Sequence, residues 1–162
     1  MIELALSRIL RALGRLFAYP ILMLLYLLWP IVRIKIGRLR ASRIGHLSSN
    51  TETFLRRRVL QIHDSECIYI LMCDPRRVSN RQLLKMYKRG LVIIDKASVY
   101  DFYTGFEHII QKTKFYQPIE SISREYREFI DTTSSLSFLE SELIEGHSFL
   151  RDCGLLDKNA WF

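Results

Sequence analysis

The residues best suited to chemistry lie in the stretch from Arg43 to Arg58. Gly45 permits a sharp turn, and the Ser-x-x-Glu pattern that begins at Ser49 predicts a capped helix running to about Arg58. The N-terminus of such a helix presents unpaired backbone N–H groups, which favour a phosphate or another anion. We therefore expect one wall of an anion site here, bordered by Arg43, Gly45, His46 and Asn50.

His46 is the candidate for acid–base chemistry in this stretch. Its imidazole could act as a general base or bind a phosphate. A histidine that only holds the loop in place explains the residue equally well. The chain contains neither a P-loop nor a Gly-x-Gly-x-x-Gly motif, so a single glycine carries the anion hypothesis.

Other polar runs have structural explanations. Consecutive helical residues point about 100° apart, so the side chains of Arg56, Arg57 and Arg58 spread around the helix and do not share one face. Cations are also favourable near a helix C-terminus without any ligand. The run His63-Asp64-Ser65-Glu66 lacks the spacing of paired metal ligands. Three cysteines without a Cys-x-x-Cys pair indicate free thiols. The sequence predicts no metal site, no catalytic triad and no pair of catalytic carboxylates.

The positive charge is concentrated at the N-terminus. The net charge is +7, and residues 1–43 hold eight Lys/Arg against one acid, so residues 44–162 are neutral. A basic region beside an apolar segment favours an anionic membrane surface as its partner. Nucleic-acid binding is not expected.

Residues 1–42 have the character of a membrane-associating segment. Residues 4–17 have helical periodicity, with apolar residues on one face and three arginines on the other. Residues 16–32 then run without a charge, close to the lower limit of about 17 residues for a spanning helix, and Pro20 and Pro30 bend or end a helix. A spanning and an in-plane arrangement both remain open, and a buried helical hairpin is the alternative. If the run spans, the main domain faces the cytoplasm.

Residues 43–162 have the pattern of an α/β domain with a parallel sheet. We expect a first strand just before this range, over 34–42, at an edge of the sheet, and buried strands over 67–73 and 91–95. A capping box at Ser79 starts a helix between the two buried strands, which makes a β–helix–β crossover. Further helices are expected over 98–112, 120–131 and 137–152.

Two segments together resemble a family of bacterial glycosyltransferases that act in surface-polysaccharide biosynthesis. The first is Arg-Ile-Gly-His-Leu from Arg43 to Leu47, with Asn50, Glu52, Phe54 and Leu55 after it. The second shares Asn80, Leu83, Leu84, Met86, Tyr87, Lys88 and Arg89, and the family often has Trp at position 87. The last residues, through Trp161 and Phe162, resemble the start of the family's next core strand.

The resemblance implies a GT-B architecture, in which two Rossmann-like domains face each other across a cleft. Residues 43–162 would form the N-terminal, acceptor-side domain of a longer protein. The donor would be a nucleotide sugar used as a substrate, with no cofactor, and the acceptor a lipid-linked compound or a polysaccharide at the cytoplasmic face of the bacterial inner membrane. A non-catalytic membrane-anchored adaptor, or an inactive truncated homologue, is the alternative.

Overall fold

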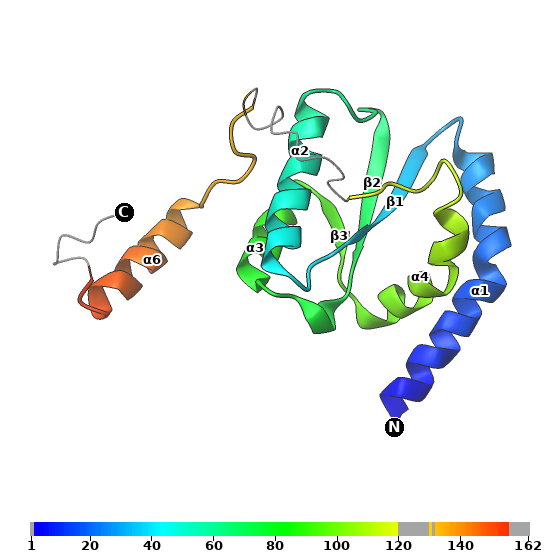
Figure 1. The fold of residues 1–162 in the computed structure, drawn as a ribbon, viewed down its shortest axis with the longest axis horizontal. Coiled ribbons are helices and arrows are strands. Elements are labelled where there is room, and N and C mark those ends of the chain that lie inside the picture. Colours follow the sequence, from blue (N-terminus) through cyan, green and yellow to red (C-terminus); the bar gives the residue numbers. More distant parts are fainter. Residues whose placement is uncertain (1, 120–129, 131, 156–162) are drawn as a thin grey trace.

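The chain folds around a small parallel sheet flanked by helices. The structure, a computed structural model, describes residues 2–119, 130 and 132–155 (Figure 1). Its three strands follow the order β1-β2-β3, all parallel. They are β1 (Arg33–Leu39), β2 (Cys67–Cys73) and β3 (Val92–Ile94). The predicted α/β class with a parallel sheet is confirmed at this level.

β2 is the centre of the sheet because its residues are apolar on both faces. Leu71 and Cys73 pack into the cluster beneath α2 (Thr51–Val59) and α3 (Arg81–Tyr87), whereas Met72 packs into the cluster beneath α1 (Ile2–Leu28) and α4 (Ala97–Ile110). The sheet is therefore the middle of three layers, with one pair of helices on each face (Figure 1).

β1 lies at the end of the strand order, as the sequence predicts, but its outer edge is not open. The backbone N–H of Ile36 donates to the carbonyl of Phe115 at 2.7 Å, and the N–H of Gln117 donates to the carbonyl of Ile36 at 3.0 Å. The segment after α4 thus covers the edge of β1, which protects it from pairing with another chain.

The β–helix–β unit over residues 67–95 is confirmed, with a different cap and with a last strand, β3, that is only partly buried, since Val92 is exposed at the end of the strand order. The Asn80 side chain accepts a hydrogen bond from the N–H of Leu83 at 2.9 Å and caps α3, in place of the predicted Ser79. Ser79 serves another contact, since its N–H donates to the carbonyl of Ala41 at 2.8 Å. This bond ties the loop after β2 to the loop after β1.

The predicted glycine turn and the capping box at Ser49 are both wrong. Gly45 has right-handed helical angles, φ −60° and ψ −42°, and helical structure begins at Ile44. A single π-helical turn, His46–Asn50, leads directly into α2. Glu52 does not reach back to Ser49, because its Oε1 accepts from Arg56 Nε at 2.9 Å and from the N–H of Ser135 at 2.8 Å.

α1 is one continuous helix that passes through Pro20 and ends two residues before Pro30. The predicted amphipathic helix and the charge-free run therefore form a single element. It packs along α4 on one face and leaves the opposite face exposed, so it is not a buried hairpin. Among the described helices, α1 alone is long and apolar enough to cross a membrane by length and composition, over Glu3–Leu28.

The remaining helices agree with the sequence where the structure describes them. α4 confirms the helix predicted over 98–112, and α6 (Glu140–Asp152) confirms the one over 137–152. α6 is held to the rest of the chain by Glu142, whose carboxylate accepts from Gln82 at 2.6 Å and from Arg89. Most of the helix predicted over 120–131, and the strand expected at the C-terminal end, lie outside the described residues.

Candidate functional site

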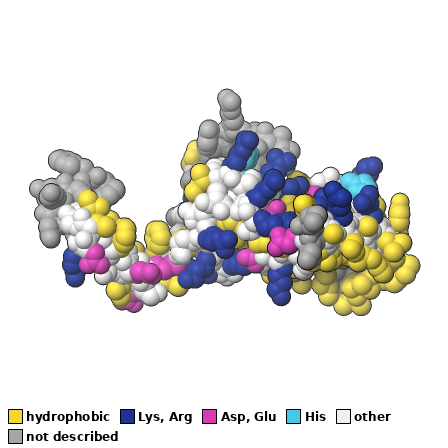
Figure 2. Space-filling view, turned by 90° about the horizontal axis from the view of Figure 1, so that it is seen from below, with side chains coloured by type: hydrophobic (Ala, Val, Ile, Leu, Met, Phe, Trp, Pro, Cys, Tyr) yellow, Lys and Arg dark blue, Asp and Glu magenta, His cyan; other side chains and the backbone are white. Residues whose placement is uncertain are grey.

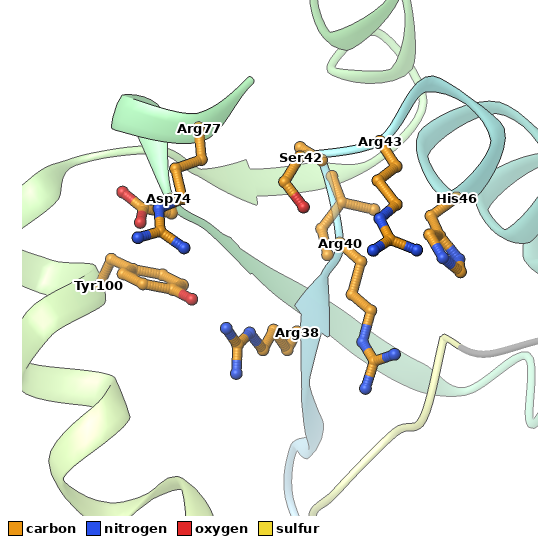
Figure 3. Close-up of a pocket in the computed structure, with 10 residues that line it drawn as sticks. Arg38, Arg40, Ser42, Arg43, His46, Asp74, Arg77 and Tyr100 are labelled. Carbon is orange, nitrogen blue, oxygen red and sulfur yellow. The ribbon is translucent and has the colours of Figure 1, made fainter. Parts of the chain in front are cut away.

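A polar hollow opens at the carboxyl ends of β1 and β2 (Figure 3). It holds about 370 Å³ and receives side chains from the loop after β1, the turn after β2, and the first turn of α4. Four arginines are among its lining residues, which are Arg38, Leu39, Arg40, Ala41, Ser42, Arg43, His46, Asp74, Arg77 and Tyr100. We call it the arginine pocket. Ligands of open α/β sheets bind at this edge, where the strands end and the loops begin.

Arg38 forms the inner wall of the arginine pocket and is already paired. Its Nη1 lies 3.3 Å from Glu107 Oε2, and its guanidinium carbon lies 5.7 Å from the centre of the Tyr100 ring. Burial lowers the pKa of Arg38, but the Glu107 carboxylate together with Tyr100 and Tyr103 outweighs burial, so the net pKa is raised. Burial also raises the pKa of Tyr100, so its phenol stays neutral and can donate its O–H to a ligand.

Asp74 supplies the carboxylate of the pocket lining, and this carboxylate is also hydrogen-bonded. It accepts from Arg76 Nε at 2.8 Å and from the Arg76 backbone N–H at 3.2 Å. The same guanidinium binds Asp101 with two hydrogen bonds of 3.1 and 2.8 Å, which hold the pKa of Asp101 below its usual value. This Asp74–Arg76–Asp101 chain fixes the turn after β2 against α4.

Arg43 and Arg77 supply the uncompensated charge of the arginine pocket. Neither side chain takes part in an ion pair or hydrogen bond with the residues that the structure describes. They come from the ends of two neighbouring strands and both line the hollow (Figure 3). Two such guanidiniums, with N–H donors in a planar fork, match the oxygens of a phosphate or diphosphate.

His46 lies beside Arg43 in the lining and is half-buried. Its Nδ1 lies 3.4 Å from Asn50 Nδ2, one helical turn further on. If the Asn50 amide donates this bond, Nδ1 is the acceptor and the proton of the neutral ring sits on Nε2. The ring would then offer an N–H donor to an anion. If the Asn50 amide is turned over, its oxygen accepts from Nδ1–H, and Nε2 becomes an acceptor and a possible base.

The predicted site residues are only partly brought together. Arg43 and His46 line the arginine pocket, whereas Gly45 and Asn50 do not, although Asn50 contacts His46. A Cβ placed on Gly45 would meet nothing within 4 Å, so no close approach requires a glycine there.

Sequence reasoning missed three arginines that line the pocket: Arg38, Arg40 and Arg77. A signal existed, because basic residues follow both of the first two strands, and the carboxyl ends of neighbouring parallel strands meet at one edge of the sheet.

A second hollow, of about 600 Å³, continues from the arginine pocket toward the start of α1. The two hollows share Arg38, Asp74, Arg77 and Tyr100. The second one also contacts α1, through Glu3, Leu4, Ser7 and Arg11. The polar site at the sheet edge is therefore continuous with a depression beside the apolar N-terminal helix.

The other polar runs have structural roles, as the sequence predicts. Arg56 is buried, binds Glu52 and donates to the carbonyl of Thr132 at 2.6 Å. Arg58 lies over the Tyr69 ring, with its guanidinium carbon 5.5 Å from the ring centre. Asp64 and Glu66 pair with Arg33. Within the described part of the chain, no cluster of three metal-ligating side chains occurs.

Comparison with known proteins adds no relative: no protein-family model, no curated protein and no solved structure matches the chain. The function must therefore follow from the residues of the site and from the helix beside it.

Proposed function

We propose that this chain is the acceptor-side portion of a membrane-associated glycosyltransferase, with a Rossmann-like N-terminal domain of GT-B type. The observation that carries the proposal is the pair Arg43 and Arg77, which line one hollow at the carboxyl ends of β1 and β2. Glycosyl transfer from a nucleotide sugar needs a site of this kind, because both the donor and a lipid-linked acceptor carry phosphates.

The size and chemistry of the arginine pocket fit a phosphorylated ligand. A volume of about 370 Å³ lies within the range of roughly 300–1,000 Å³ typical of small-molecule sites. Arginine binds phosphate through two parallel N–H donors, and the nearby N-terminus of the Ile44 helix adds the positive end of its dipole. Tyr100 can add a neutral O–H donor.

The second hollow favours an acceptor that is attached to a lipid. It leads from the arginine pocket to Leu4 on α1, and α1 exposes a long apolar face. A phosphate bound by the arginines could therefore belong to a molecule whose chain stays in the bilayer at the cytoplasmic face of the inner membrane. The nucleotide sugar is a substrate in this proposal, and no cofactor is required.

Within this proposal His46 is the candidate base that accepts the proton of the acceptor hydroxyl, and Asn50 is the residue that orients its ring. Arg43 binds the phosphate, and Gly45 belongs to the helix that positions His46. A complete protein that keeps normal transfer activity after His46→Ala would rule out the base and leave the phosphate site standing.

A non-catalytic membrane adaptor remains the second candidate, and one observation favours it. Asp74, the carboxylate in the pocket lining, is held by Arg76. No second carboxylate among the described lining residues is placed to act with His46. An adaptor would use the arginine pocket to bind a phosphorylated partner without transforming it.

The direct test is sugar transfer by membranes that contain the complete gene product. Radiolabelled nucleotide sugars are supplied, and label is measured in solvent-extractable lipid and in polysaccharide. We expect transfer that falls at least tenfold in Arg43→Gln and is unchanged in Arg81→Gln, an exposed arginine outside the pocket. Equal transfer by Arg43→Gln and the natural protein would contradict the proposal, and membrane binding without transfer from any donor would favour the adaptor.

A further inference from the structure

The face of α1 that points away from α4 is apolar along its whole length. Its exposed side chains are large and hydrophobic: Leu6, Ile9, Leu13, Leu16, Met23, Leu24 and Leu27. The side chain of Leu16, for example, is 70 % exposed. Figure 2 shows hydrophobic side chains gathered at the α1 end of the molecule, with basic side chains next to them. A contiguous apolar face of this length marks a surface that another phase or molecule covers.

The opposite face of α1 packs against the α/β domain. Ser7, Gly14, Ala18, Leu22 and Leu25 are buried on this face, spaced three, four and seven residues apart. Gly14 contacts Gly105 of α4 so closely that a Cβ on either residue would strike backbone atoms of the other helix. Further along α1, toward its C-terminal end, Leu22 and Leu25 pack with Tyr103, Phe106 and Phe115 in one buried cluster.

We infer that α1 lies in the plane of an anionic bilayer, with its outward face among the acyl chains, and does not cross the bilayer. This inference rests on the proposed membrane association and decides its mode. From Leu16, the first residue after the last arginine, to its end at Leu28, α1 rises about 20 Å at 1.5 Å per residue. A hydrocarbon core is about 30 Å thick, so the charge-free part of the helix is too short to span it.

Spanning would also require α1 to leave α4. The buried aromatic side chains of α4, Tyr103 and Phe106, would lose their apolar cover. The exposed Arg8 and Arg15 would enter lipid, where a cation near the centre of a helix is costly. In the in-plane arrangement, the same arginines reach lipid phosphates while the α4 contact remains intact.

The end of α1 has the side chains of a membrane interface. Lys114 Nζ lies 4.3 Å from the centre of the Trp29 ring and 5.1 Å from that of the half-exposed Tyr26. Trp, Tyr and Lys of this kind gather at the headgroup level of bilayers. An anionic bilayer fits this face better than a second copy of the chain, because residues 1–43 hold eight basic residues against one acid and two copies would repel each other.

The side of the membrane from which two cysteines can be labelled distinguishes the in-plane arrangement from the spanning one. The natural Cys153 is exposed and reports the side of the domain. A second variant carries Glu3→Cys with Cys153→Ser and reports the start of α1. Each full chain is produced in bacterial cells and labelled with a membrane-impermeant maleimide in spheroplasts and in inverted vesicles. We expect both cysteines to label from the same side. Labelling from opposite sides, or of position 3 only after detergent, would overturn the inference.

Vesicle binding tests the face itself. Ile9→Glu with Leu16→Glu should weaken binding to phosphatidylglycerol vesicles at least tenfold, and phosphatidylcholine vesicles should bind the natural chain weakly. Ile62→Glu, at an exposed apolar residue away from α1, is the control. A dimer that the α1 substitutions dissociate in the absence of lipid, with vesicle binding unchanged, would contradict the inference. A chain that labels from one side but binds no phosphate would overturn the proposed function and leave this inference intact.

Discussion

Gly14 of α1 and Gly105 of α4 pack backbone against backbone. A Cβ on Gly14 would lie 2.0 Å from the carbonyl oxygen of Phe102, and a Cβ on Gly105 would lie 2.2 Å from that of Arg11. Only two residues without side chains allow this approach. The contact joins the apolar N-terminal helix to the α/β domain, so the exposed apolar face of α1 and the arginine pocket belong to one body.

Gly105→Ala should destabilise the chain. The added methyl group meets a backbone oxygen that cannot move without shifting a helix, and overpacking of this kind costs about 1–3 kcal/mol. The free energy of unfolding, measured by denaturant titration, should fall by that amount. Gly146→Ala, in α6 with nothing within 4 Å of its Cβ, is the matched control and should not destabilise. Equal stability of Gly105→Ala and the natural chain would show that the two helices do not touch.

Gly45→Ala should stabilise the chain, which is the opposite of what a glycine turn requires. The residue has right-handed helical angles and open space around its Cβ position. Alanine in such a position stabilises by about 0.4–1 kcal/mol, chiefly by restricting the unfolded chain. Thermal unfolding at constant pH measures the difference, and a lower melting temperature in Gly45→Ala would mean that this segment is not helical.

Tyr87→Phe should loosen the π-helical turn that carries His46. The buried Tyr87 hydroxyl donates to the carbonyl of Ser48 at 3.0 Å, within that turn. Loss of a hydrogen bond of this kind costs about 0.5–1.5 kcal/mol. Tyr19→Phe, at an exposed residue of α1, should leave the free energy of unfolding unchanged. If the two variants unfold alike, Tyr87 does not support the turn.

Stability should fall as the pH drops from about 7.5 to 5.5, in part because of His63. Burial lowers the pKa of His63, and the nearby cations Arg57, Lys35 and Arg58 lower it further. The unfolded chain, with a histidine pKa of about 6.5, therefore takes up the proton first. The contribution of neutral His63 is present above that pH and is lost as the pH falls through the folded-state pKa.

Urea midpoints at the two pH values measure this dependence. His63→Gln should reduce the loss of stability between them, whereas His108→Gln, at an exposed position of α4, should not. The carboxylates whose pKa values are lowered, such as Asp101, titrate below this window and do not interfere. An unchanged pH dependence in His63→Gln would exclude this histidine as its source.

The elements that sequence predicts well are those with a strong local pattern. The apolar run of β2 and the aromatic face of α4 each determine a structure from their own residues. The helix after β1 starts elsewhere than predicted because tertiary contacts override the local Ser49–Glu52 pattern. Tyr87, far along the chain, holds a carbonyl of the π-helical turn, and Glu52 bonds to Arg56 and Ser135.

Local sequence patterns predict only part of the candidate site, for the same reason. Arg43 and His46 stand in one segment beside a helix N-terminus, so local reasoning reaches them. Arg77 follows a different strand, and its place in the same hollow as Arg43 depends on the parallel pairing of β1 with β2. The Gly14–Gly105 contact leaves no local trace at all, because each glycine alone is an ordinary helical residue.

Calorimetric titration with inorganic pyrophosphate tests most directly whether the arginine pocket binds a phosphorylated ligand. The full chain in lipid nanodiscs is titrated alongside the double variant Arg43→Gln, Arg77→Gln and the control Arg81→Gln. We predict saturable binding by the natural chain and by the control, weakened at least tenfold in the double variant. Equal affinity of all three proteins, or no binding by the natural chain, would contradict the account.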